Sequence, residues 1–211
     1  MPKNKTKEDM NMKNKIWYFA LILTALNLNA HQPRMVNASV VKIENPEVSQ
    51  AFYASKPATY IIQEDKPFEL FVQILRPAIG KLDKNISVLI KKDETEIARL
   101  DGNSAEWTFF HEPFANDDYY QGPEYSGKAQ GAYTISVTAS GKYVFVVGKK
   151  EAWPAKEIAK TLYLLPQLKM YFEKSPLLAY WNISGAFAAG IIILLGLSTF
   201  TLLKIIRRFK K

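Results

Sequence analysis

"GAYTISVTASGKYVFVVG", residues 131–148, shows the alternation of apolar and polar side chains that is typical of two paired β-strands. The residues that would face a core recur at every second position: Tyr133, Ile135, Val137, Tyr143, Phe145 and Val147. Ser140 and Gly141 lie between the two runs, where a tight turn would join the strands. The stretch therefore predicts an antiparallel hairpin with one buried face.

The same pattern extends upstream and predicts a mainly β fold. In "PFELFVQIL", residues 67–75, apolar side chains alternate from Phe68 to Ile74. "NISVLIKK" at 85–92 repeats the pattern, and "EIARLDG" at 96–102 ends in an Asp-Gly turn. Short strands separated by frequent turn residues predict an antiparallel, jelly-roll-like β-sandwich over residues 31–150.

Two resemblances agree with an exported β domain. The spacing of Gly131, Tyr133, Gly141, Tyr143 and Gly148 resembles the closing hairpin of bacterial pre-peptidase C-terminal domains, which are exported jelly-roll-like modules. The whole layout, with "HQPR", "ENPEVSQAFY" and "GKYVFVVGKKE", is similar to uncharacterised single-span envelope proteins of prokaryotes. These resemblances imply a fold and a location, and they assign no functional residues.

The two ends of the chain predict a membrane address. Residues 1–30 contain lysines followed by a short apolar run, which is typical of a signal peptide; a retained N-terminal anchor is the alternative. Residues 177–203 carry no charge and predict one transmembrane helix, with the basic residues 204–211 as a cytoplasmic tail. The prediction is a single-pass protein of the cytoplasmic membrane, in contact with the lipid bilayer, whose N-terminal domain is extracytoplasmic.

Residues 151–176 predict an amphipathic neck helix between the sandwich and the predicted span. Pro154 suits the first turn of a helix, and Ile158, Leu162 and Leu165 recur at helical spacing. Pro166 is expected to kink or restart the helix. Two positions for this neck stay open: on a membrane surface, or packed on the sandwich.

Charge and composition exclude several functions. The net charge of +8 comes from the two ends, because residues 31–176 contain 18 basic and 18 acidic side chains. A balanced middle offers no basic surface for phosphates, so no nucleic-acid partner is expected. The chain has no cysteine, which excludes thiolate metal sites and cysteine nucleophiles. No Gly-x-Ser-x-Gly motif is present, and we expect no enzyme.

The densest cluster of chemistry-bearing residues is "WTFFHEPFANDDYYQGPEY", residues 107–125. We expect its first half, through Phe114, to be mostly buried, and residues 116–125 to be partly exposed. Aromatic rings beside carboxylates suit a binding surface for another envelope protein or a glycan. The candidate surface consists of Trp107, Asn116, Asp117, Asp118, Tyr119, Tyr120, Glu124 and Tyr125.

Two metal sites are alternatives to a purely binding surface. If a signal peptide ends at Ala30, His31 becomes the N-terminal residue, and its amine and imidazole together with His111 would give nitrogen ligands for copper. Calcium is the second alternative, through the oxygen ligands of Asn116, Asp117, Asp118 and Glu124. The favoured prediction remains a non-enzymatic binding or scaffolding role in the cell envelope.

Overall fold

The computed structural model describes residues 31–209. The predicted signal peptide at 1–30 and the last two residues of the basic tail lie outside the described residues. Strands dominate the described chain as far as residue 147, and helices follow from residue 155. The mainly β prediction for residues 31–150 agrees with this order.

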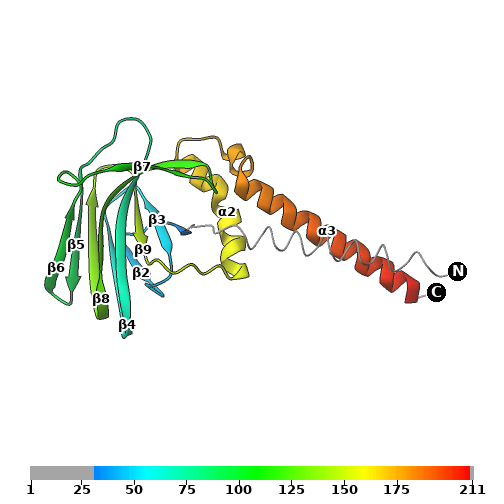
Figure 1. Ribbon diagram of the computed structural model, residues 1–211, viewed down its shortest axis with the longest axis horizontal. Coiled ribbons are helices and arrows are strands. Elements are labelled where there is room, and N and C mark those ends of the chain that lie inside the picture. Colours follow the sequence, from blue (N-terminus) through cyan, green and yellow to red (C-terminus); the bar gives the residue numbers. More distant parts are fainter. Residues whose placement is uncertain (1–30, 210–211) are drawn as a thin grey trace.

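The described residues contain nine strands and three helical segments (Figure 1). The strands are β1 (Gln32–Met35), β2 (Val40–Ile43), β3 (Gln50–Ala54), β4 (Ala58–Pro77), β5 (Ile86–Lys92), β6 (Thr95–Asp101), β7 (Thr108–Glu112), β8 (Asp117–Ala139) and β9 (Tyr143–Val147). The helical segments are α2 (Ala155–Tyr171), the short 3₁₀ helix η1 (Pro176–Tyr180) and α3 (Ile183–Phe209).

Two long strands, β4 and β8, run through both layers of a sandwich. The first layer pairs β1, β3, β9, residues 68–77 of β4, residues 117–129 of β8, and β7. The second layer pairs β2, residues 58–64 of β4, residues 131–139 of β8, β5 and β6. The pairing of β4 with β8 shifts register between Glu64 and Phe68, where the strands pass from one layer to the other. Gly131 lies at this crossing with φ of 95°, a conformation that glycine adopts without a steric penalty.

The sheet is mixed, which corrects the expectation of a purely antiparallel sandwich. β1 runs parallel to β3, and β2 runs parallel to β4. Parallel neighbours need a crossover connection. Here the chain makes it by placing β2 in the second layer between β1 and β3, which both belong to the first layer. The sequence pattern reports which residues face inward, but not the direction of the neighbouring strand.

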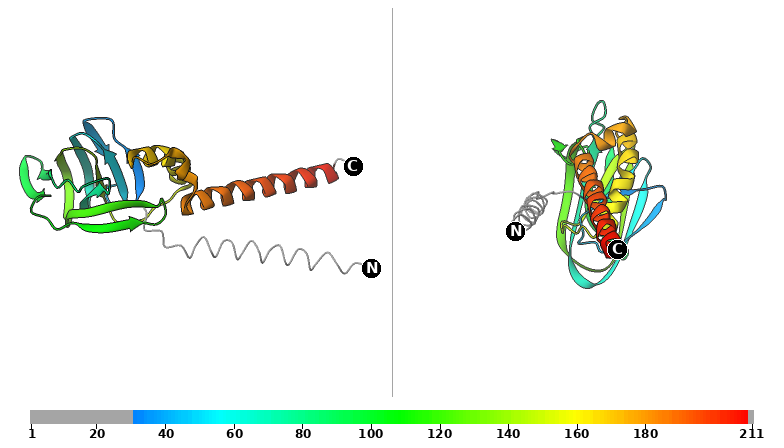
Figure 2. Two further views of the ribbon diagram at one scale, coloured as in Figure 1. Left: turned by 90° about the horizontal axis from the view of Figure 1, so that it is seen from above. Right: turned by 90° about the vertical axis from the view of Figure 1, so that its right-hand side faces the viewer.

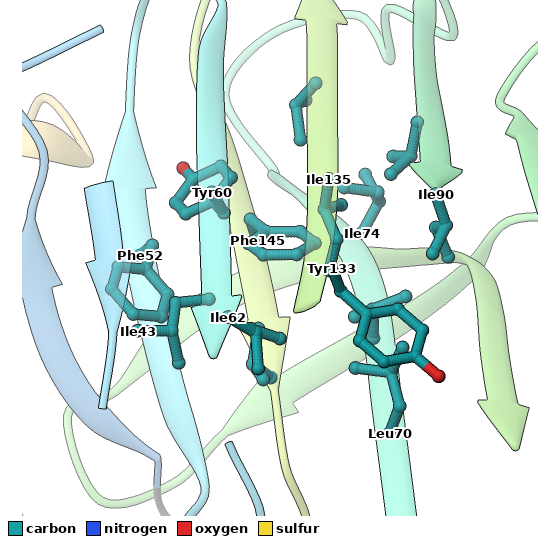
Figure 3. Packing of buried hydrophobic residues seen from close by; sticks show 14 of the residues in the cluster. Ile43, Phe52, Tyr60, Ile62, Leu70, Ile74, Ile90, Tyr133, Ile135 and Phe145 are labelled. Carbon is teal, nitrogen blue, oxygen red and sulfur yellow. The ribbon is translucent and has the colours of Figure 1, made fainter. Parts of the chain in front are cut away.

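The main core fills the space between the two layers (Figure 3). The alternation in 67–75 and 131–148 is confirmed, because the residues predicted to point inward are buried there: Phe68, Leu70, Val72, Ile74, Tyr133, Ile135, Val137, Tyr143, Phe145 and Val147. Aromatic rings join the layers across this core. Tyr60 from the second layer and Phe145 from the first have ring centroids 4.3 Å apart.

A second core lies on the outer side of the first layer, under helix α2. Leu165, Leu168 and Tyr171 of α2 pack there against the outward residues of β3, β4 and β9. Every residue of β3 and of β9 is therefore buried, with one face toward each core. Of the two positions left open for the neck helix, the structure shows the one packed on the sandwich. Pro166 lies inside α2, which runs on to Tyr171 without a restart.

The predicted transmembrane helix at 177–203 and the single-pass membrane location are wrong. Within residues 31–209, no helix combines the length and the apolar character needed to cross a bilayer. The uncharged run is not one helix: it begins in η1, breaks at Trp181 and Asn182, and enters α3, which continues into the charged residues that follow position 203. The prediction assumed that an uncharged run forms one continuous helix. Figures 1 and 2 show α3 pointing away from the sandwich.

Candidate functional site

The candidate site is the hairpin of β7 and the first part of β8, which reaches across the sandwich toward α2 (Figure 1). Glu112 organises its turn, since the carboxylate accepts hydrogen bonds from the backbone N–H groups of Phe114 at 2.9 Å and Ala115 at 2.7 Å. Asn116 then takes φ of 59°, which asparagine tolerates better than most residues. Because the strands alternate, the hairpin has two chemically different faces.

One face, here called the inner face, is attached to the helices by a buried ion pair. Asp117 is 1% exposed, and its Oδ1 accepts from the Nζ atoms of Lys169 at 2.7 Å and Lys174 at 2.9 Å. Lys169 also donates to the carbonyl oxygen of Ala115, and the side-chain amide of Asn182 donates to the same oxygen at 2.9 Å. The turn is therefore held by groups from α2 and from the segments on either side of η1.

Tyr119 continues the inner face into the second core. Its hydroxyl lies 2.9 Å from that of Tyr53, and its ring meets Phe172 edge-on at 5.0 Å between centroids. Burial raises the pKa of Tyr119 well above its ordinary value, so the phenol stays neutral. Phe110, its neighbour on β7, packs against the same cluster. These side chains contribute to packing.

The opposite face, here called the outer face, carries exposed rings and a hydrogen-bonded pair. Phe109 is 57% exposed and meets Tyr120 edge-on at 6.0 Å. Two residues along each strand, the Nδ1 atom of His111 lies 2.6 Å from Oδ1 of Asp118, and both side chains are partly exposed. Trp107 covers Gly122, where any side chain would collide with the indole ring.

The eight residues predicted as a binding surface are distributed over several environments. Asp118 and Tyr120 lie on the outer face, and Trp107 closes one end of it while packing partly against the main core. Asp117 and Tyr119 are buried on the inner face, and Asn116 sits in the turn. Glu124 is exposed and accepts from the amide of Gln73 at 3.1 Å, whereas Tyr125 packs partly against the main core. As a set, these residues stay a prediction.

Phe109 is the residue that the sequence analysis missed. It was expected to be buried because it stands among aromatic residues, yet it is the most exposed ring of the hairpin. The signal that would have found it is alternation: if Tyr119 and Phe110 face inward, Phe109 and Tyr120 must face outward. Buried and exposed residues of 107–125 therefore alternate along the strands, and they are not separated into a first and a second half.

The residues proposed as metal ligands have other partners and environments. His111 is on the outer face beside Asp118, whereas His31 contacts the hydroxyl of Ser49 at the end of β1. Asp117, a candidate calcium ligand, is already occupied by two ammonium groups. Across the part of the chain that the structure describes, no group of three or more His, Asp or Glu side chains is placed to hold a metal ion. Copper and calcium binding stay predictions.

The contact between His31 and Ser49 resembles half of a catalytic pair. Part of His31 reaches solvent, but the surrounding protein desolvates its ring. This desolvation lowers the pKa of the imidazole to about 4. A general base works best with a pKa near the operating pH, so this imidazole is poorly suited to deprotonate Ser49. Ser49 itself is 2% exposed.

Comparison with known proteins gives distant likenesses in structure. No protein-family model and no curated protein matches the chain. PliG of Aeromonas hydrophila, a periplasmic inhibitor of g-type lysozyme, is 12% identical, with a TM-score of 0.30 over 55% of this chain and 97% of that chain. The pre-peptidase C-terminal domain of a Bacillus anthracis collagenase is 10% identical, with a TM-score of 0.29 over 58% and 98%.

PliG of Salmonella Typhimurium is similar to the same degree, at 14% identity and a TM-score of 0.27 over 54% of this chain and 100% of that chain. The resemblance to pre-peptidase C-terminal domains that the hairpin at 131–148 indicates is thus found again among solved structures. These likenesses concern the fold alone. The residues of the hairpin and its surroundings must carry the functional argument.

Proposed function

We propose that the chain is a non-enzymatic binding protein that holds a protein partner on the outer face of the β7–β8 hairpin. The observation that carries the proposal is the exposed ring pair of Phe109 and Tyr120, flanked by the pair of His111 and Asp118. A solvent-exposed aromatic anchor with polar groups around it has the composition of a protein–protein hot spot. A glycan is the other partner that stacked rings would suit.

Rigidity of the hairpin supports this role. The ion pair of Asp117 with Lys169 and the bond between Tyr119 and Tyr53 fix the inner face. The rings of the outer face are therefore presented on a backbone that is already ordered, and little entropy is lost when a partner binds. A catalytic role has less support, because the pKa of about 4 makes His31 a weak base for Ser49.

The proposal is tested by partner capture with the full chain. The chain carrying a photo-crosslinker at His111, which shares the outer face with Phe109, is expressed in its own cells, and crosslinked polypeptides are identified by mass spectrometry. We expect Phe109→Ala to reduce capture about tenfold or more, as loss of a hot-spot ring does. Tyr163→Ala is the matched control, because Tyr163 is a 74% exposed ring on α2, and its loss should leave capture unchanged.

Two outcomes would contradict the proposal. Equal capture by the wild type and Phe109→Ala would show that the rings do not bind the partner. Crosslinks to a carbohydrate that survive protease treatment, without any polypeptide, would show that the partner is a glycan. Each variant is first checked by thermal unfolding, so that loss of capture is not confused with loss of folding.

A further inference from the structure

A cavity separates part of helix α2 from the first layer of the sandwich, on the side of the hairpin opposite to the outer face. Its volume is about 390 Å³, which falls within the range of small-molecule sites. Six aromatic side chains line it: Tyr53, Phe71, Phe110, Phe114, Tyr119 and Trp153. A ligand in the cavity could therefore contact several aromatic rings.

The cavity also contains hydrogen-bond acceptors that the protein does not fully use. Thr161 of α2 lines it and is 7% exposed, yet its Oγ1 has no hydrogen-bond partner within residues 31–209. A buried hydroxyl without a partner costs free energy, so a ligand that forms a hydrogen bond with it would gain from the contact. Glu112 lines the cavity from the hairpin, and burial is the main cause that raises the pKa of its carboxyl group.

The charges around the cavity favour a cation. Glu112 and Glu151 contribute two carboxyl groups, Lys149 contributes one ammonium group, and His31 is neutral at pH 7. Burial raises the pKa of both carboxyl groups, and a bound cation would favour their charged form. The ammonium of Lys149 lies 4.3 Å from the ring centroid of Phe71, so the protein's own chain already places a cation on one of these rings. Rings and carboxylates together are the environment in which organic ammonium ions are recognised.

We propose that the cavity binds a small organic ammonium ion, whose apolar body lies against the aromatic wall while its N–H groups donate to Glu112 and Thr161. A carboxylate gains most from a ligand that donates hydrogen bonds and carries the opposite charge. A neutral ligand of the same shape would keep the apolar contacts and lose this attraction. The site is separate from the outer face of the hairpin and does not depend on the proposed partner.

Isothermal titration of the full chain tests the proposal with three probes of increasing size, each of which carries N–H donors: methylammonium, butylammonium and 2-phenylethylammonium chloride. The neutral comparison is 2-phenylethanol, which has the same ring and spacer. We expect at least one ammonium probe to bind, and 2-phenylethylammonium to bind about tenfold or more tightly than the alcohol. No heat from any ammonium probe, or equal binding of the alcohol, would overturn the proposal.

Variants then locate the site. Glu112→Gln keeps an acceptor for the turn but removes the charge, and should weaken ammonium binding about tenfold. Glu173→Gln is the matched control, because this exposed carboxylate pairs with Lys142 at 2.9 Å outside the cavity, and affinity should not change. Phe109→Ala should also leave affinity unchanged, which separates this site from the outer face.

Thr161→Val keeps the test valid if Glu112→Gln folds poorly. Valine has nearly the same shape as threonine and removes only the unpartnered hydroxyl, so the unfolding temperature should rise while ammonium affinity falls severalfold. Wild-type affinity in both Thr161→Val and Glu112→Gln would show that the probe binds elsewhere, and would overturn the assignment.

Discussion

The two faces of the β7–β8 hairpin are built from the same kinds of residue and behave in opposite ways. Asp117 and Tyr119 on the inner face are buried, whereas their immediate neighbours Asp118 and Tyr120 reach solvent on the outer face. The difference arises from strand alternation and from the helix that covers only one side. Whether a carboxylate or a ring of this hairpin is buried or available for binding depends on which face of the strand it occupies.

The largest expected difference is between Asp117→Ala and Asp118→Ala. Removing Asp117 leaves the 1% exposed Lys169 without its counter-charge, and the free energy of unfolding should fall by about 3–5 kcal/mol. Removing Asp118 breaks an exposed pair and should cost less than about 1 kcal/mol. Urea unfolding of both variants measures the difference. Similar small losses would mean that the buried ion pair does not hold the hairpin.

The next difference concerns the two tyrosine hydroxyls. Tyr119→Phe leaves the hydroxyl of Tyr53 without its buried partner and should destabilise the fold by about 1–3 kcal/mol. Tyr120→Phe keeps the ring contact with Phe109 at the surface and should change stability by less than about 0.5 kcal/mol. Thermal unfolding compares the two. A larger loss for Tyr120→Phe would reverse the assignment of the faces.

His31, which lies away from the outer face, should make the stability of the fold depend on pH. The pKa of its imidazole is about 4 in the folded chain, compared with 6.5 for an ordinary histidine. As pH falls from 6.5 toward 4, the unfolded chain binds a proton that the folded chain excludes, so His31 lowers stability across that window. His31→Gln should flatten the decline. Unfolding midpoints measured across this pH window check it, and parallel curves for the two proteins would contradict the expectation.

The smallest expected effect is the coupling between Phe109 and Tyr120. Their edge-on contact at 6.0 Å is at the surface, so a double-mutant cycle to alanine should give a coupling energy of about 0.5 kcal/mol in unfolding. The same cycle measured on partner capture should give a larger value, since both rings would meet the partner. A strong coupling in unfolding alone would indicate that the rings serve stability.

Alternation in the sequence predicted the main core correctly, including the inward residues of β9, but it did not predict that a helix covers the opposite face of β3 and β9. Tyr133, Ile135 and Val137 face inward as expected, because one face of that part of β8 is exposed. β3 and β9 carry no such contrast, since α2 buries their other face. The contact of α2 with these strands is between segments far apart in the chain, which no local pattern reports.

The candidate site was predicted only as a region. The density of rings and acids in 107–125 indicated the hairpin, but aromatic density alone suggested burial for Phe109 and exposure for Tyr119, and both were placed on the wrong side. The partner of Asp117 could not be anticipated, because Lys169 lies 52 positions away. The break at Asn182 in the uncharged run at 177–203 lies at a contact with Ala115, which is 67 positions away and which no local pattern reports.

The passage of β4 and β8 through both layers has a consequence for how the domain unfolds. Each layer contains half of the same two strands, so neither layer can lose its central pair without pulling on the other. Because these strands are distant in sequence, their pairing closes long loops, as the pairing of β3 with β9 also does, and folding should be limited by the formation of these pairs. Backbone amides of both layers should therefore exchange with solvent as one cooperative unit, with a single opening free energy.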